Sequence, residues 1–183
     1  MSKIITIDDF YNNPYEVREH ALSKEFKVAG NYPGLRTEVE VGPWFHGFKS
    51  HFEEILNLKV TNWPEGYNSS FQLTTKGCKT WIHYDATVWA AVVYLTPDAP
   101  LAAGTALYRN KYTGIFRHAE DAAVDYNEVQ SVPADWEAIV EVGNVFNRAV
   151  IYSGNYYHSS VLPGFGTCKQ TGRLFQTFFF DTE

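Results

Sequence analysis

The sequence is poor in sulfur and has no long apolar run. Cysteine occurs only twice in 183 residues, at Cys78 and Cys168, and methionine occurs once. Two cysteines this far apart exclude a disulfide framework and a cysteine-rich zinc site, so we expect thiols in a reducing compartment. No stretch reaches the length of a membrane-spanning helix, and the first residues show no signal-peptide pattern. We therefore expect a cytoplasmic protein.

Positive charge is also scarce. Lysine and arginine number 15 against 21 aspartates and glutamates, which gives a net charge of −6. A chain of this kind, with no basic stripe, gives no sign of binding nucleic acid or an anionic membrane. A small metabolite and a protein side chain both stay open as partners, and so does the oligomeric state.

What is present is an ordinary globular composition with many aromatic residues. Apolar residues make up 45% and charged residues 20% of the chain, and the length fits a single domain over residues 1–183. Aromatic residues reach 16%, a composition that favours strands over helices.

The first 68 residues read as a helical support. A short strand is expected at Lys3–Ile7, and a helix at Tyr15–Ser23 with Asn13 as its N-cap and a proline at its first position. A second helix is expected at Phe45–Leu56, where aromatic and aliphatic residues form one stripe.

Residues 69–181 read as a β-rich core. Turn signals separate short alternating or apolar runs, and Asp135 could cap a helix that ends at Val142. Segment 111–130 lacks periodicity and is a candidate lid. The pattern predicts a mostly β sandwich or jelly roll with N-terminal helices (α+β). The expected strands are Phe71–Thr75, Lys79–Tyr84, Val88–Leu95, Gly104–Arg109, Val145–Tyr152 and Arg173–Phe180.

A candidate metal site begins with His83 and Asp85. In an extended segment these two side chains share a face, because side chains repeat with period two. One more histidine completes the set of two histidines and one carboxylate that suits non-haem Fe(II). We prefer His158, which closes a regular strand, over His118, which lies in the irregular segment.

Arg173 is a candidate anion site. It opens the last strand, 15 residues after His158, and by alternation it shares a face with Phe175, Thr177 and Phe179. An arginine on such an apolar face is costly without an anion to pair with. The far carboxylate of an oxo-acid cosubstrate fits this requirement through bidentate hydrogen bonds.

Together these residues resemble the Fe(II)/2-oxoglutarate-dependent oxygenases, in the prolyl-hydroxylase-like branch. The resemblance rests on the order of His83, Asp85, His158 and Arg173 and covers about residues 69–181. It implies a double-stranded β-helix (jelly roll) in which the first three residues hold Fe(II). It also implies a dioxygenase that hydroxylates its substrate while 2-oxoglutarate yields succinate and CO₂.

Two further roles come from the same resemblance. Tyr94 ends a strand that is similar to a family strand, and the family places a tyrosine there beside the arginine on the far carboxylate of 2-oxoglutarate. Gln72 falls where several members have a polar side chain near the iron-bound end of the cosubstrate. For Gln72, a cross-strand polar contact explains the residue equally well.

Two other classes fit the same residues. A cupin-like metalloprotein could use the His/Asp/His site without 2-oxoglutarate. A non-catalytic jelly-roll module could bind a sugar or a protein, with the His-X-Asp pattern incidental, because short motifs occur often by chance.

Overall fold

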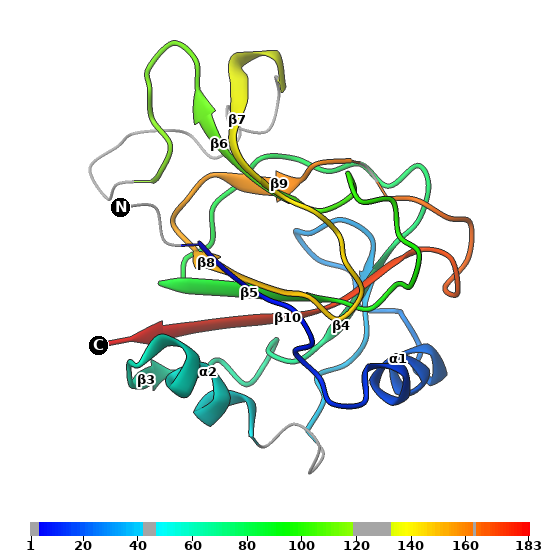
Figure 1. Cartoon of the computed structure of the whole chain (residues 1–183). Helices are drawn as coiled ribbons and strands as arrows, with labels where there is room; N and C mark the ends of the chain where they lie inside the picture. The colour runs from blue at the N-terminus through cyan, green and yellow to red at the C-terminus, as the bar shows by residue number, and fades with distance from the viewer. Residues whose placement is uncertain (1–3, 42–46, 119–132, 163) are drawn as a thin grey trace.

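The computed structural model describes residues 4–41, 47–118, 133–162 and 164–183. This part of the chain is mostly β, with two antiparallel sheets facing each other and two α-helices on the outer side of the larger sheet (Figure 1). The helices are α1 (Pro14–Ser23) and α2 (Phe48–Leu56). The mostly β class and the N-terminal helices are confirmed.

The larger sheet has seven strands in the order β1-β8-β5-β10-β4-β2, with β3 also paired to β10. The smaller sheet has the order β7-β6-β9. The larger sheet consists of β1 (Ile4–Ile7), β2 (Leu35–Arg36), β3 (Val60–Asn62), β4 (Phe71–Thr74), β5 (Trp89–Tyr94), β8 (Ala149–Ser153) and β10 (Arg173–Thr182). The smaller consists of β6 (Thr105–Asn110), β7 (Trp136–Val142) and β9 (His158–Ser160).

Strand β10 organises the larger sheet because it pairs with β5 on one side and β4 on the other. Its side chains alternate between the two faces. One face, formed by Arg173, Phe175, Thr177 and Phe179, lines the space between the sheets. The sequence predicted that these four residues share a face. The other face packs against the helices.

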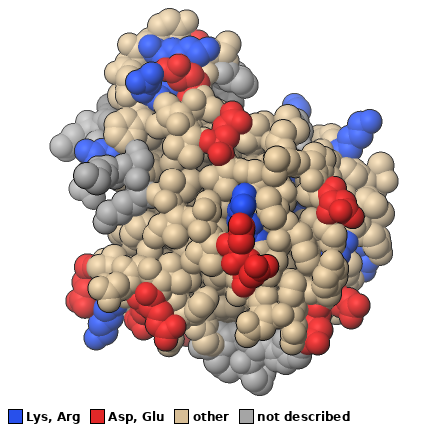
Figure 2. All heavy atoms as spheres, viewed as in Figure 1, with Lys and Arg blue, Asp and Glu red and all other residues tan. Residues whose placement is uncertain are grey.

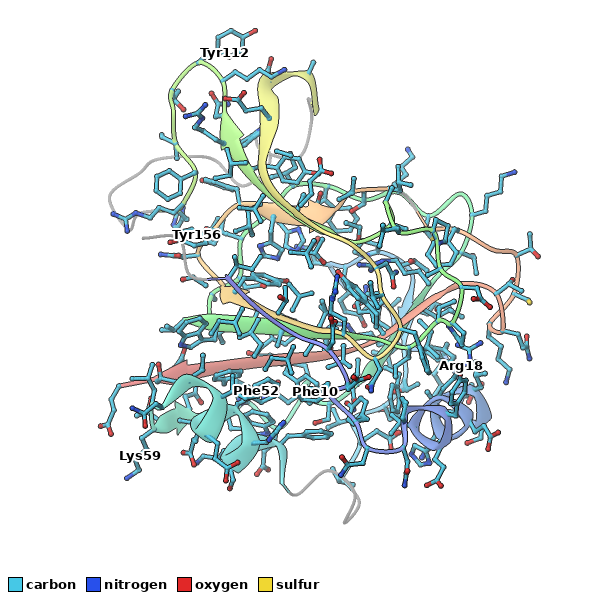
Figure 3. All side chains as sticks on the ribbon, in the orientation of Figure 1. Phe10, Arg18, Phe52, Lys59, Tyr112 and Tyr156 are labelled. Carbon is cyan, nitrogen blue, oxygen red and sulfur yellow. The ribbon has the colours of Figure 1, made fainter. Side chains whose placement is uncertain are left out.

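The helix-facing core is largely aromatic. Phe52 of α2 is fully buried, and its ring centroid lies 5.1 Å from that of Phe178 and 4.9 Å from that of Phe180. Figure 3 shows Phe10 and Phe52 in this layer between α2 and the larger sheet. Burial of these rings fixes the sheet on one side and leaves its other face free to carry polar groups.

The segment predicted as a helix after Asp135 is a strand. A short 3₁₀ turn, Pro133–Asp135, leads into β7, which pairs with β6. The aspartate and Gly143 resembled helix signals. The strand is favoured by its β-branched residues, Ile139, Val140 and Val142. A bulge at Leu107/Tyr108 shifts the pairing of β6 with β7, so the alternation of buried and exposed residues in β7 is irregular.

Three other details of the secondary structure differ from the sequence prediction. Segment 79–84 is not a strand of either sheet and pairs only through a single bridge at His83. The strand expected from Val145 begins at Ala149, because Asn147 adopts a left-handed conformation with φ of 64°. Asn13 precedes α1, but its side chain makes no capping hydrogen bond.

Charged side chains on the face shown in Figure 2 lie in small groups of both signs among other residues. At the tip of the β6–β7 hairpin, Arg109 Nη2 lies 2.6 Å from Glu137 Oε1. On the larger sheet, Arg148 pairs with Asp8, with Nε 2.6 Å from Oδ1. No helix in the described ranges combines the length and the apolar character needed to cross a bilayer.

Candidate metal centre and its pocket

His83, Asp85 and His158 come together between the sheets. His83 and His158 face each other through two backbone hydrogen bonds, His83 N to His158 O at 3.0 Å and His158 N to His83 O at 2.8 Å. The amide of Asp85 donates to Gly154 O at 2.8 Å. One nitrogen or oxygen from each of the three side chains lies within 4.8 Å of the others. The structure therefore brings together the three residues that the sequence singled out.

Gly154 makes this approach possible. A Cβ atom at this position would lie 2.1 Å from the carbonyl oxygen of Thr87 and 3.3 Å from the Cβ of Asp85. Any side chain here forces the backbone next to Asp85 to move. The glycine thus lets the two segments approach closely enough to place the carboxylate beside the histidines.

The two imidazoles are oriented by the same local device. His83 Nδ1 lies 3.0 Å from the carbonyl oxygen of Trp81, and His158 Nδ1 lies 2.8 Å from that of Tyr156. A carbonyl only accepts, so each Nδ1 carries the proton and donates it. Each Nε2 then has its lone pair free, which is the arrangement found in metal-binding histidines.

The carboxylate lacks a donor. Asp85 Oδ2 is buried and has no hydrogen-bond partner among the described residues, although His158 Nε2 lies 3.3 Å away. With Nδ1 protonated, that Nε2 is an acceptor and cannot satisfy the oxygen. Three acceptors directed at one point leave a place for a cation, and two nitrogens with one oxygen fit a divalent transition metal.

Electrostatics keep His83 and Asp85 in the forms that bind a metal. Burial, and after it the neighbouring His158, lowers the pKa of His83 to about 4, so His83 is neutral near pH 7. Burial acts to raise the pKa of Asp85, but His158, His83 and Arg36 outweigh it and hold that pKa below its usual value. Asp85 is therefore ionised.

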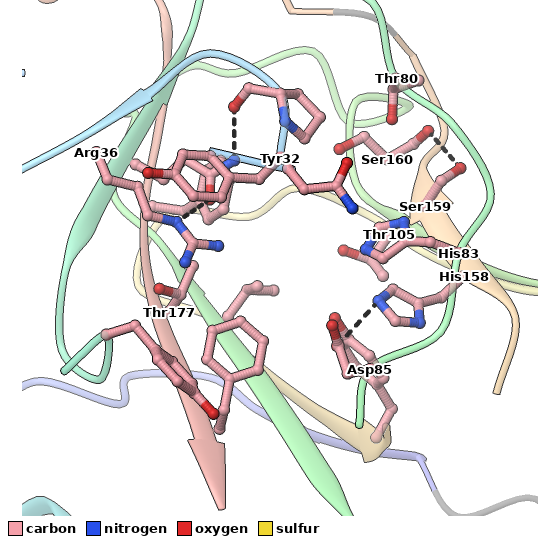
Figure 4. Close-up of a pocket in the computed structure, with 18 of the residues that line it drawn as sticks. Tyr32, Arg36, Thr80, His83, Asp85, Thr105, His158, Ser159, Ser160 and Thr177 are labelled. Atoms are coloured by element: carbon pink, nitrogen blue, oxygen red, sulfur yellow. Dashed lines mark hydrogen bonds and ion pairs between the residues drawn. The ribbon is translucent and has the colours of Figure 1, made fainter. Parts of the chain in front are cut away.

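The three residues open into a cavity of about 260 Å³ between the sheets (Figure 4). Its described walls come from β2, β4, β5, β6, β8, β9 and β10, from the loop before β2, from Tyr67 and from the segment that carries His83. Asp85 is the one carboxylate among these lining residues, while Arg36 and Arg173 both line the cavity. The polar wall thus has more positive than negative charge before any ligand binds.

Arg173 lies deep in this cavity, with 2% of its surface exposed. Its Nε donates to Ala103 O at 3.0 Å, and its guanidinium carbon lies 4.3 Å from the centroid of the Phe175 ring. No carboxylate in the described ranges lies within 4 Å of this guanidinium. Burial lowers the pKa of Arg173 without removing its charge, so the side chain can pair with an anion that enters the cavity.

Tyr94 is fully buried behind this wall. Its hydroxyl lies 2.7 Å from Thr105 Oγ1, and Tyr94 is not among the described residues that line the cavity, whereas Thr105 is. Tyr152 of β8 does line the cavity, with its ring centroid 4.7 Å from that of His158. The sequence reasoning missed Tyr152, which the alternation of β8 could have placed on the inner face with Val150.

Gln72 and Arg36 are adjacent in the β2–β4 pair. Gln72 accepts a hydrogen bond from Arg36 Nε at 2.8 Å and donates to Pro33 O at 2.7 Å. The cross-strand polar contact of Gln72 is therefore present, and its contact with a cosubstrate stays a prediction. Arg36 was missed because a two-residue strand carries no readable pattern.

Two further predictions concern His118, the alternative third ligand, and segment 111–130, the candidate lid. His118 stacks on Tyr84, with ring centroids 3.9 Å apart, and is not part of the His/Asp/His cluster. Most of the predicted lid, segment 111–130, lies outside the described residues.

The fold resembles solved Fe(II)/2-oxoglutarate oxygenases. It matches a prolyl hydroxylase from Trichoplax adhaerens solved with a hypoxia inducible factor peptide, at 12% identity, TM-score 0.58, covering 97% of this chain and 82% of that one. It matches a Pseudomonas putida prolyl-4-hydroxylase at 16% identity and TM-score 0.57, covering 98% and 92%. It also matches HygX from Streptomyces hygroscopicus, solved with nickel, 2-oxoglutarate and hygromycin B, at 11% identity and TM-score 0.62, covering 98% and 82%.

Fold and site together therefore define a protein with the prolyl-hydroxylase-like fold and a His/Asp/His cluster. Residues 1–180 match the model described as "Family of unknown function (DUF6445)", and the chain belongs to this family. No curated protein matches the chain.

Proposed function

We propose that this protein is an Fe(II)- and 2-oxoglutarate-dependent dioxygenase built on a double-stranded β-helix. The observation that carries the proposal is the pairing of two buried features in one cavity. One is a set of three acceptors with an unsatisfied carboxylate oxygen, and the other is an arginine with no carboxylate partner in the described part of the chain. A divalent metal satisfies the first and a dicarboxylate the second.

In this proposal His83, Asp85 and His158 hold Fe(II) through Nε2, a carboxylate oxygen and Nε2. Arg173 binds the far carboxylate of 2-oxoglutarate, and Thr105 and Tyr152 add hydroxyl groups along the wall. The hydroxyl of Tyr94 holds Thr105, and the Tyr94 ring lies beside Arg173, with the guanidinium carbon 5.4 Å from its centroid. A contact of Tyr94 with the cosubstrate stays a prediction of the resemblance. When bound, the iron and 2-oxoglutarate would supply the chemistry by which O₂ oxidises a substrate C–H bond, with one oxygen atom going to the substrate and the other to succinate, and with CO₂ as coproduct.

The protein's own residues bind, orient and shield. The Nδ1 hydrogen bonds of the two histidines fix the direction of each Nε2. Phe175, Phe179 and Val92 give the cavity apolar surface, which excludes water from the cosubstrate and strengthens the charge pairing with Arg173.

The direct test is an anaerobic titration. Protein with Fe(II) and 2-oxoglutarate is expected to show a weak visible charge-transfer band that requires both additions. His83→Ala is expected to abolish the band, and the exposed His51→Ala serves as the matched control. A band that persists in His83→Ala rejects the site. Metal binding without any response to 2-oxoglutarate favours the cupin-like alternative.

A further inference from the structure

Arg36 is a second unpaired cation in the same cavity. Its guanidinium points into the cavity from the wall opposite His83, His158 and Asp85 (Figure 4). The guanidinium carbon lies 3.9 Å from the centroid of the Tyr32 ring and 5.5 Å from that of Phe179. No carboxylate of the described residues lies within 4 Å of it.

The protein holds Arg36 in place without neutralising it. Gln72 accepts from Nε at 2.8 Å, and the backbone of Arg36 is bonded to Val28 O at 2.9 Å. The fork formed by its two terminal nitrogens has no protein partner in the described ranges. A planar fork held by its Nε and stacked on an aromatic ring is suited to a bidentate carboxylate.

The charges of the cavity are not balanced when the metal and 2-oxoglutarate are bound. A divalent metal and two arginines bring four positive charges, while Asp85 and the 2-oxoglutarate dianion bring three negative ones. One positive charge is left, and an uncompensated charge in a partly dry site is costly. The more accessible of the two arginines is Arg36, because Arg173 is 2% exposed and lies behind Phe175.

We infer that Arg36 binds a carboxylate of the primary substrate, and that the substrate is a small molecule bearing this group next to an apolar or aromatic body. The inference rests on the proposed function, because it assigns the other anion to Arg173. The cavity of about 260 Å³ has room for a small ligand, and Tyr32, Tyr67 and Phe179 provide rings beside the anchor. Gln72 is a positioning residue for Arg36.

The test uses protein loaded with Zn(II), which is redox-inert, and saturated with 2-oxoglutarate. Carboxylate and carboxamide pairs (benzoate and benzamide, phenylacetate and phenylacetamide, hippurate and hippuramide) are titrated by saturation-transfer NMR. Wild type is expected to prefer at least one carboxylate over its amide by about 10-fold, the size of one charge-assisted contact. Arg36→Gln is expected to reduce the preference to about 2-fold or less, and Arg36→Lys to leave an intermediate value, since it keeps the charge and loses the fork.

Arg109→Gln is the matched control, because Arg109 is exposed and pairs with Glu137 away from the cavity. Calorimetric titration with 2-oxoglutarate accompanies every variant, and circular dichroism checks that Arg36→Gln and Arg36→Lys are folded. The inference is overturned if no wild-type pair favours the carboxylate, if Arg36→Gln keeps the preference, or if Arg36→Gln and Arg36→Lys lose 2-oxoglutarate binding. In the first two cases 2-oxoglutarate binding survives and the proposed function stands. Absence of 2-oxoglutarate binding by wild type rejects the proposed function, and this inference with it.

Discussion

The imidazole of His83 links the site to the stability of the metal-free protein. Its pKa falls from the ordinary value of 6.5 to about 4 on folding, so the folded protein binds fewer protons than the unfolded chain between these pH values. The free energy of unfolding must then decrease as the pH falls from about 6.5 to about 4, by on the order of 3 kcal/mol for this group.

Denaturant unfolding of the metal-free protein across this pH range measures the effect. His83→Asn removes the titrating group and is expected to flatten the slope, while His51→Asn, on the exposed face of α2, is expected to keep it. A slope that is equal in all three proteins contradicts the neutral, buried state of His83.

Variants of Arg173, Tyr152 and Tyr94 can distinguish residues that contact 2-oxoglutarate directly from residues that only support the cavity wall. Arg173→Gln is expected to weaken 2-oxoglutarate binding by at least about 100-fold, because a buried charge-assisted pair is lost, while the metal still binds. Tyr152→Phe, which alters the cavity wall, is expected to weaken 2-oxoglutarate more than Tyr94→Phe, which removes only the hydroxyl behind Thr105. Calorimetry with Zn(II)-loaded protein measures all three, and the opposite order of the tyrosine variants assigns Tyr94 the direct contact.

At the scale of elements, the alternating side chains of strand β10 serve the helix-facing core on one face and the cavity on the other. Phe178 is fully buried between Phe48, Phe52 and Trp63, whereas its neighbour Phe179 is half-buried and lines the cavity. Phe178→Ala is expected to lower the free energy of unfolding by about 3–5 kcal/mol, the usual cost of a large cavity in a core. Phe179→Ala is expected to cost clearly less. Urea unfolding compares the two, and equal losses contradict the assignment of faces.

The same alternation explains which features of the fold and the site could be predicted from the sequence. Period two placed Arg173 on one face with Phe175, Thr177 and Phe179 and paired His83 with Asp85, because side-chain direction in extended backbone depends only on the residue count. Which face of β10 lines the cavity depends on the packing of the helices, which the alternation does not encode. It failed for β7, where a bulge in the partner strand disturbs the pattern, and it could not find Arg36. The place of Arg36 depends on how β2 pairs with β4, and a two-residue strand does not encode its partner.

At the scale of the whole molecule, metal binding is coupled to folding. The three candidate ligands converge only when β9 lies against the segment that carries His83, so the unfolded chain binds a metal more weakly. Zn(II) at 100 times its dissociation constant is expected to add about 2.7 kcal/mol, which raises Tm by about 5–10 °C for a chain of this length.

Thermal unfolding with and without Zn(II) measures this shift. His158→Ala is expected to abolish it and His51→Ala to keep it. A shift that survives in His158→Ala places the metal elsewhere.

The alternation of β10 also determines what a one-residue error in its pairing would do to the protein. A pairing displaced by one residue turns Arg173 toward the helices and an aromatic ring into the cavity. If Arg173 binds the cosubstrate as we propose, such a slip is expected to remove cosubstrate binding and core packing together. Molecules with the displaced register are then expected to bind no 2-oxoglutarate at all, and no form with intermediate affinity is expected. Under the proposed function, the number of 2-oxoglutarate molecules bound per chain at saturation is then expected to equal the fraction of molecules in which β10 has the correct register.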